Sequence, residues 1–515
     1  MLSYFIWRQL TYATCIYLLQ AFVNKVNEDY AKKHFSFEKQ FWGTKMALKS
    51  TDETPYSTDL LSSTKKEMED LLADPKILAD AKAHREAIGD DASSDLAKTL
   101  DIIIKTCGCY TMPTASAKSI REETSKVEGT LEKNRNEMKL GYTDPADSST
   151  FHEMSSVGLR NLLRTSPEES TRKAAYEGLR SIGPFVVENG FVEIVKLRNK
   201  LAHELGFVDY YDMTVTNAEG FGKDKLFEIL DGLEEGTRPL MEEARKELAK
   251  RHGEDALEPW NMSFKMAGSV IKQMDPYFPF GKAVENYARS YAAMKIDYKG
   301  ATMNLDLLDR THKYSNGFCH WPVPAWRKPD GEWVPSSTNF TSLADPAAVG
   351  SGLTALTTLM HEVRRLLPCA RCLIYFYSFI QLYCTNGFVV LTLFIIYHSL
   401  LFYLLISTYI QAGHAAHFAN IQQPSPLFSQ ERAPTSVAYA ENQSMFLDSL
   451  VGDASWRAKY AKNLDGKSIP FDIIEEEIKS THPFAVFGLR AMLSVSYFEK
   501  VRHIILFLLL FFHLV

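Results

Sequence analysis

The chain has 515 residues, of which 46% are hydrophobic and 12% aromatic, so it can bury a large core and is long enough for two or three domains. Its 57 basic and 63 acidic residues leave a net charge of -6, and no basic run is dense enough to follow a phosphate backbone. This composition excludes a disordered chain and argues against nucleic acid as a partner.

The first two thirds of the chain are predicted to form a helical body, because apolar residues recur three or four positions apart among Glu, Lys and Ala. Ser166 is expected to cap one helix, with Pro167 in its first position and Glu169 in its third. The other predicted helices are residues 59–90, 115–140, 186–205, which ends at Gly206, 222–252 and 281–295.

Residues 311–341 break the helical pattern, because they are rich in Trp, Val, Phe, Thr and Pro. The turn Lys328-Pro329-Asp330-Gly331 lies between FCHWPVPAW and EWVPSSTNF, which predicts a β hairpin. Two interpretations remain open at this point. A free strand edge could hold an extended peptide through main-chain hydrogen bonds, or the hairpin is purely structural.

A split motif follows the predicted hairpin. His361-Glu362 ends one apolar-flanked segment and Ala412-Gly413-His414 begins another, with residues 363–411 between them. Joined directly, the two segments read HEAGH, and the histidines at i and i+4 lie on one helix face, where both can bind a metal ion. The flanking sequences LTALTTLMHE and AGHAAHFANI then form one continuous amphipathic helix.

The residue types of this motif indicate zinc-dependent hydrolysis. A hydrolytic zinc ion takes three protein ligands and keeps one position for water, whose pKa it lowers. His361 and His414 supply two ligands, and Glu362 is placed to act as general base.

A third ligand is predicted at Glu441, within the segment SVAYAENQSMFLDSL. This segment is expected to be a helix whose apolar residues direct Glu441 inward. Those apolar residues are Val437, Tyr439, Phe446 and Leu447. Glu431 and Asp448 are the alternative third ligands, and Glu441 ranks first because it lies inside the apolar-flanked helix.

The chain resembles the M3 family of zinc metallopeptidases, the group of thimet oligopeptidase and oligoendopeptidase F. The resemblance rests on the joined HEAGHAAHF, on AYAENQS, on RNKLAHELGFVDYYD, and on SNGFCHWPVPAW with NFTSL. It implies a mainly α, clam-shaped fold with a small β hairpin region beside the active-site helix. It also implies one Zn²⁺ held by His361, His414 and Glu441, with Glu362 as base and short peptides as substrates. A cytoplasmic or organelle-lumen location follows for such an enzyme.

The chain departs from this family in three places. An apolar insert interrupts the zinc helix, an apolar leader precedes the helical start, and the chain ends in an apolar tail where the family carries a tyrosine-rich segment that stabilises the oxyanion. The sequence is expected to divide into five segments. Residues 1–20 form the leader, and residues 21–362 contain the helical body, the hairpin and the first half of the zinc helix. The insert is 363–411, residues 412–500 contain the second half of the zinc helix and the third-ligand helix, and the tail is 501–515.

Two origins of the insert are open. It reads as a retained intron. Its first residues, Val363-Arg364, can be encoded by a sequence that begins with GT and continues with a purine-rich triplet, and its last residue, Gln411, can be encoded by CAG, which supplies the AG of an acceptor site. Alternatively it is a membrane segment, because residues 373–410 carry no charge. Membrane association is expected only through residues 366–410 and the terminal apolar segments.

Either origin puts the activity of the chain as written in doubt, so three functions are considered. The first is a zinc-dependent endopeptidase that hydrolyses short peptides. The alternative is a catalytically inactive, membrane-anchored protein that binds peptides. The third is an aminopeptidase with the same zinc chemistry, which needs an acidic site for the free amine of the substrate, and the sequence indicates no such site. The full chain of 515 residues, with the insert in place, is expected to be insoluble or membrane-associated and to lack peptidase activity. The reason is that the apolar insert has to leave and rejoin the zinc helix.

Overall fold

The computed structural model describes residues 2–51, 53–89, 94–310, 312–314, 317–362, 413–429, 432, 434–436 and 438–512. The predicted insert at 363–411 therefore lies outside the described residues. Helices dominate the described part of the chain, and the sheets are small, so the mainly α fold class predicted from the sequence is confirmed. No helix among the described residues combines the length and the apolar character that a membrane span requires.

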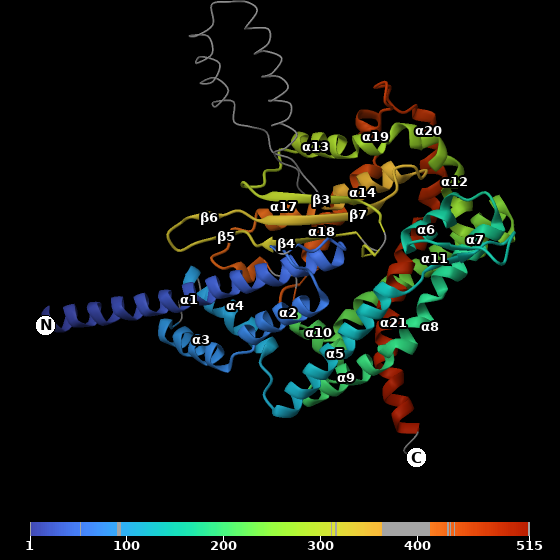
Figure 1. The fold of residues 1–515 in the computed structure, drawn as a ribbon. Coiled ribbons are helices and arrows are strands. Elements are labelled where there is room, and N and C mark those ends of the chain that lie inside the picture. The colour runs from blue at the N-terminus through green and yellow to red at the C-terminus, as the bar shows by residue number, and fades with distance from the viewer. Residues whose placement is uncertain are drawn as a thin grey trace, which may run out of the picture.

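Four helices form an N-terminal layer that packs around one apolar core (Figure 1). The layer consists of α1 (Leu2–Lys45), α2 (Thr58–Leu72), α3 (Pro75–Ile88) and α4 (Asp95–Tyr110). The predicted helical stretch that starts at residue 59 contains the two helices α2 and α3, because Asp74 caps α3 by accepting a hydrogen bond from the Lys76 N–H and Pro75 occupies its first position. Helix α1 runs without interruption across residue 20.

The middle of the chain is a series of packed helices. They are α5 (Ala115–Glu137), α6 (Ser156–Thr165), α7 (Glu169–Arg180), α8 (Ile182–Val186), α9 (Val192–Glu204), α10 (Tyr210–Glu219), α11 (Lys223–His252), α12 (Met262–Met274) and α13 (Ala283–Ala293). A π-helical turn, η1 (Val187–Phe191), joins α8 to α9, and short 3-10 turns are η2 (Glu254–Leu257), η3 (Asp275–Tyr277) and η4 (Phe280–Lys282). A two-stranded antiparallel pair, β1 (Gly141–Thr143) and β2 (Phe151–Glu153), follows α5.

The expected cap at Ser166 is wrong. Ser166 ends α6, where its N–H donates to the Leu162 carbonyl, and α7 begins at Glu169 without a side-chain cap. Helix α9 ends as predicted, because Leu205 closes it and Gly206 adopts the left-handed φ of 86° that glycine tolerates.

A three-stranded sheet in the order β3-β7-β4 lies at the centre of the molecule. Its strands are β3 (Thr302–Leu308), β4 (Phe318–Val323) and β7 (Ser337–Ala344), with β3 parallel and β4 antiparallel to β7. The predicted hairpin is present, because β4 returns as β7 and the short strands β5 (Trp326–Arg327) and β6 (Trp333–Val334) pair at its tip. Gly331 has a φ of 86° in the tip turn.

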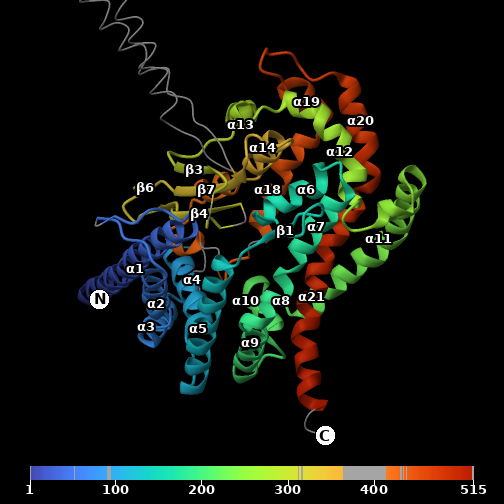
Figure 2. The same cartoon turned by 45° about the vertical axis from the view of Figure 1, so that its right-hand side comes forward.

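The C-terminal part supplies the remaining elements. They are α14 (Ser351–Glu362), α17 (Gly413–Ala419), η5 (Pro426–Ser429), α18 (Ala438–Ser449), η6 (Leu450–Gly452), α19 (Ala454–Tyr460), α20 (Phe471–Thr481), η7 (His482–Phe484) and α21 (Ala485–Phe512). Helix α21 continues across residue 500 and lies along α11 (Figure 2).

The sheet is covered on both sides, by α1 on one side and by α13 and α14 on the other (Figures 1 and 2). Helix α1 contacts β4, and α14 contacts β7. The largest core cluster joins α12, α13, the sheet, α14 and α18 to α20. Gly352 allows α14 to start there, because a Cβ at this position would lie 1.6 Å from the Phe278 carbonyl oxygen.

Candidate metal centre

Helices α14 and α17 bring the two motif histidines together, although residues 363–411 separate them in the sequence. His361 is the penultimate residue of α14, and His414 is the second residue of α17. Their imidazole centroids are 4.9 Å apart and their ring planes meet at 83°. The two histidines therefore face one site from two helices.

Glu441 joins the histidines from α18, which contacts both α14 and α17. Its Oε2 lies 3.4 Å from His361 Nε2 and 3.4 Å from His414 Nε2. When Nε2 is protonated, hydrogen bonds from His361 and then His414 hold the pKa of Glu441 well below its usual range, despite its partial burial. The side chain of Glu441 is 49% exposed, so the cluster is open to solvent on this side.

Asp448 lies two helical turns beyond Glu441 and contacts the His361 ring at its other nitrogen, Nδ1. Its Oδ2 is 2.8 Å from His361 Nδ1, so the Nδ1–H donates to the carboxylate. The lone pair of neutral His361 is then at Nε2, directed at Glu441. A nitrogen lone pair that faces a carboxylate oxygen at 3.4 Å is repulsive unless a proton or a cation lies between them.

The spacing of these donors fits a small tetrahedral ion. Zinc lies about 2.0–2.1 Å from nitrogen and oxygen ligands, which places two such ligands about 3.3–3.4 Å apart. Both nitrogen-to-oxygen distances at Glu441 are 3.4 Å, and the ligand atoms of the three residues all lie within 4.8 Å of one another. Nitrogen and carboxylate donors in this number are the set that zinc takes in hydrolytic sites. The residues therefore fit the predicted ion.

Some of the predicted residues can be placed and others cannot. Glu362 is the last residue of α14, but its side chain lies outside the described residues, as does Glu431. The expectation that Phe446 directs Glu441 inward is wrong, because Phe446 is 64% exposed, whereas Leu447 is buried. The assignment of Glu362, His361, His414 and Glu441 to their catalytic roles stays a prediction.

Tyr291 of α13 supports the end of α14, and the sequence did not single it out. Its hydroxyl donates to the Met360 carbonyl at 2.5 Å, directly before His361. Carbonyls in the last turn of a helix need partners from outside that turn, so this hydrogen bond stabilises the end that carries the first histidine. A buried tyrosine in a run of helix-forming residues gave no signal of this contact.

The segment between α17 and α18 is fastened to the N-terminal layer. Arg432 Nη2 donates to Glu38 Oε1 of α1 at 2.7 Å. Ser425 Oγ donates to Asn27 Oδ1 at 2.7 Å, and Lys105 Nζ donates to the Pro434 carbonyl at 3.3 Å. These contacts fix the path of the chain from His414 to Glu441.

Strand β4 connects this layer to the second half of the motif. Trp321 stacks on Phe418 of α17 with ring centroids 3.4 Å apart, and Phe418 lies one turn beyond His414. The Trp321 carbonyl accepts a hydrogen bond from His34 Nε2 of α1 at 3.0 Å. At Trp321, therefore, the edge of β4 is already occupied, which favours the structural interpretation of the hairpin at that residue.

Comparison with known proteins gives one sequence match and several structural likenesses. No curated protein matches the chain by sequence. Its structure is similar to that described as Pz peptidase A with inhibitor 2, with a TM-score of 0.46, 13% identity, and coverage of 93% of this chain and 75% of the other. Trypanosoma cruzi metallocarboxypeptidase 1 gives a TM-score of 0.44 and 14% identity, with coverage of 89% and 67%.

The sequence match is to the profile for Peptidase family M3, over residues 162–363. The matched segment contains β3, β4, β7 and α14, and it stops one residue after Glu362. Over this segment the chain is similar to Peptidase family M3.

Proposed function

We propose that the chain carries the site of a zinc-dependent endopeptidase that hydrolyses short peptides. The observation that carries the proposal is the convergence of His361, His414 and Glu441, each from a different helix. His361 lies within the family M3 match, and the other two residues lie beyond it. The fit of their spacing to a tetrahedral ion supports zinc.

Each residue has a distinct part in this proposal. A zinc ion held by the three side chains supplies Lewis-acid chemistry, which acidifies water and polarises the substrate carbonyl. His361 and His414 would hold the ion through Nε2, and Glu441 would hold it through a carboxylate oxygen. Glu362 accepts the proton from water and donates it to the leaving amine. Asp448 keeps the His361 Nδ1 protonated, so that Nε2 stays available as a ligand.

The experiment compares the full chain with a deletion of Val363 to Gln411, each assayed for solubility, zinc content and cleavage of an internally quenched peptide. The peptide is blocked at both ends, so that enzymes that require a free terminus do not cleave it. The deletion is extended at its C-terminus with the tyrosine-bearing segment of an M3 relative for the cleavage assay. We expect the deletion to be soluble, to bind one zinc ion and to cleave, and the full chain to do none of these.

Glu362→Gln in the same deletion is the matched test of the base. It should keep zinc and lose roughly 10²–10⁴-fold in kcat, because an amide cannot accept the proton from water. Near-normal kcat would overturn the role of Glu362. A full chain that is soluble and binds zinc as tightly as the deletion would overturn the retained-intron interpretation, and sequencing complementary DNA across the codons for Glu362 and Ala412 tests that interpretation directly.

A further inference from the structure

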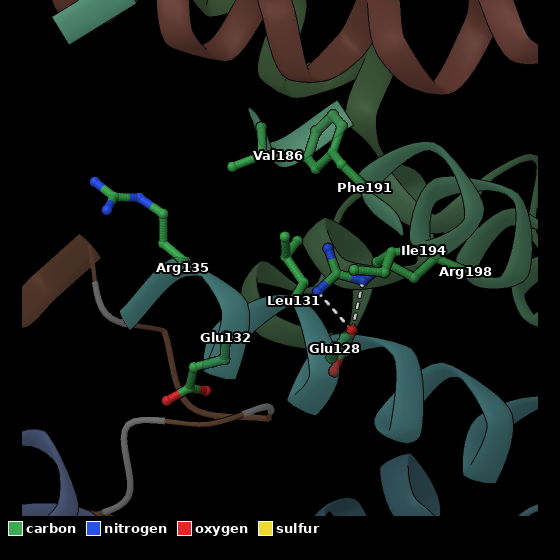
Figure 3. Close-up of a pocket in the computed structure, with 8 residues that line it drawn as sticks. All are labelled: Glu128, Leu131, Glu132, Arg135, Val186, Phe191, Ile194 and Arg198. Carbon is green, nitrogen blue, oxygen red and sulfur yellow. Dashed lines mark hydrogen bonds and ion pairs between the residues drawn. The ribbon is translucent and has the colours of Figure 1, made fainter. Parts of the chain in front are cut away.

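A cavity of about 300 Å³ lies in the helical body, between α5 and the bent segment from α8 to α9 (Figure 3). Its apolar wall consists of Leu131, Val186, Phe191 and Ile194. This volume is at the lower end of the range for ligand pockets, so the cavity is suited to one apolar side chain and a small polar group.

The bend that opens the cavity is built into the sequence. The π-helical turn η1 contains Gly190, whose φ is 102°, and Asn189, whose backbone is also non-helical. Asn134 of α5 holds this bend by donating to Asn189 Oδ1 at 2.8 Å. Val186 and Phe191 flank the bend, and both side chains line the cavity.

The charges around the cavity do not balance. Glu128 is paired with Arg198, whose Nη2 lies 2.7 Å from Glu128 Oε1, and Glu132 is paired with Lys45. Both acidic residues of the lining are therefore neutralised. Arg135 remains, and no acidic side chain in the described part of the chain forms an ion pair with it.

Arg135 is only partly exposed, and burial lowers the pKa of its guanidinium. Figure 3 shows this guanidinium directed away from the Glu128–Arg198 pair. A partly desolvated cation without a counterion is unfavourable, and an anion with two oxygens in one plane compensates it with paired hydrogen bonds. The cavity thus offers an apolar wall beside a partly buried guanidinium that forms no ion pair within the described residues.

We propose that this cavity, the Arg135 pocket, binds a carboxylate that carries an apolar side chain, as in the C-terminal residue of a peptide. A single guanidinium matches the single charge and planar fork of a carboxylate, whereas a phosphate dianion would need a second unpaired cation. The pocket shares no residue with the metal centre, so the proposal stands or falls separately from the peptidase function.

The test measures binding of N-acetyl-L-leucine and of N-acetyl-L-leucinamide by calorimetry. The protein is the full chain in non-ionic detergent with a chelator present, so that the metal centre does not contribute. The two probes differ in charge and share the apolar side chain. We expect the acid to bind at least roughly tenfold more tightly than the amide, which is the size of a charge-assisted hydrogen bond.

Arg135→Gln should abolish this preference for the acid. The matched control is Arg180→Gln, which removes an arginine that is 64% exposed on α7 and should keep the preference. Phe191→Ala should weaken both probes equally, because it shortens the apolar wall. If Arg135→Gln does not fold, Arg135→Lys keeps the charge, loses the planar fork, and should retain a reduced preference.

Equal binding of acid and amide overturns the proposal, and so does an Arg135→Gln variant that keeps the preference. Absence of binding of either probe at millimolar concentration overturns it as well. Inorganic phosphate is the third probe. If phosphate binds in an Arg135-dependent manner and the acid does not, the pocket is an inorganic anion site and the proposal is wrong.

Discussion

The molecule contains two groups of two histidines and one glutamate, and they differ in what surrounds the glutamate. The open cluster is His361, His414 and Glu441, whose glutamate is 49% exposed. The buried cluster is His34, His320 and Glu38, whose side chains are each at most 5% exposed. Residue type alone does not distinguish the two groups.

Hydrogen bonding distinguishes them. In the buried cluster, His320 Nδ1–H donates to Glu38 Oε2 at 2.8 Å and Arg432 donates to Oε1 at 2.7 Å. Asn339 Nδ2 donates to His320 Nε2 at 3.0 Å, and Asn339 Oδ1 accepts a hydrogen bond from Asn304 Nδ2 at 2.8 Å. Each donor in this series of hydrogen bonds meets an acceptor, and Arg432 supplies the positive charge.

The open cluster lacks such a cation, because no lysine or arginine in the described ranges pairs with Glu441. Its acceptors converge on one point and leave a positive charge to be supplied from outside. A group of histidines and a glutamate is structural where an arginine pairs with the glutamate, as Arg432 does with Glu38. It is a candidate metal centre where no lysine or arginine pairs with the glutamate, as at Glu441 within the described residues. The following predictions test this distinction, beginning with the largest expected effect.

Glu441→Ala should reduce zinc affinity by more than roughly 100-fold. Residues that only hydrogen-bond to a metal-binding side chain typically contribute up to that factor, and Glu441 is proposed to bind the ion itself. Two histidines alone form a poor zinc site, because a third protein ligand is missing. Competition with a chromophoric chelator measures the affinity in the chain that lacks residues 363–411. Unchanged affinity would make Asp448 or Glu431 the better third ligand.

Glu38→Gln should have the opposite signature and lower the free energy of unfolding by about 3–5 kcal/mol, because the buried Glu38 side chain loses the charge that pairs with the partly exposed Arg432. Urea denaturation measures this value. Glu441→Gln is the matched substitution in the open cluster and should cost less than about 1 kcal/mol. Similar losses of stability in the two variants would remove the distinction between the clusters.

Local patterns in the sequence predicted the elements that carry the open cluster. Leu353, Leu356 and Leu359 recur at helical spacing before His361, and α14 forms there. The Lys328–Gly331 turn likewise places the hairpin. Glu441 falls in the first turn of α18, within the segment predicted to be helical. Its role as third ligand was predicted from its place in an apolar-flanked helix, and the resemblance to family M3 implied the same residue.

Contacts between distant segments could not be predicted in this way. Glu38 and Arg432 are 394 positions apart, and neither residue's neighbours carry information about the other. Asp448 illustrates a different limit. It is seven positions after Glu441, which places both carboxylates on the same face of α18, so spacing offered either as a ligand. Only the position of the His361 ring distinguishes their roles, because Asp448 lies at Nδ1 and Glu441 lies at Nε2.

Asp448→Asn should weaken zinc binding by roughly 10–100-fold, which is the usual effect of removing a carboxylate that orients a metal-bound histidine. The asparagine amide can present its N–H₂ to His361 Nδ1 and thereby favour the tautomer that carries its proton on Nε2. Chelator competition measures the loss, with Asp453→Asn on the neighbouring α19 cap as the control. An effect as large as that of Glu441→Ala would mean that Asp448 is itself a ligand.

The buried cluster should also make stability depend on pH. Burial lowers the pKa of His34 from its ordinary value of 6.5. Burial opposes the ionisation of Glu38, but its hydrogen bond with His320 and the charge of Arg432 hold its pKa well below the ordinary 4.5. Both groups therefore bind protons more readily in the unfolded chain, so the free energy of unfolding rises with pH wherever they titrate.

The stability that these two groups contribute is complete above pH 6.5 and is lost in two stages as the pH falls, the first below 6.5 from His34 and the second below 4.5 from Glu38. His34→Gln can keep the hydrogen bond to the Trp321 carbonyl through its amide N–H₂, yet it cannot be protonated. Urea denaturation at pH 7.5 and pH 5.5 should show a smaller pH-dependent loss in this variant than in the parent chain. An equal loss in the two proteins would mean that His34 is not the group responsible, and that the first stage arises outside the buried cluster.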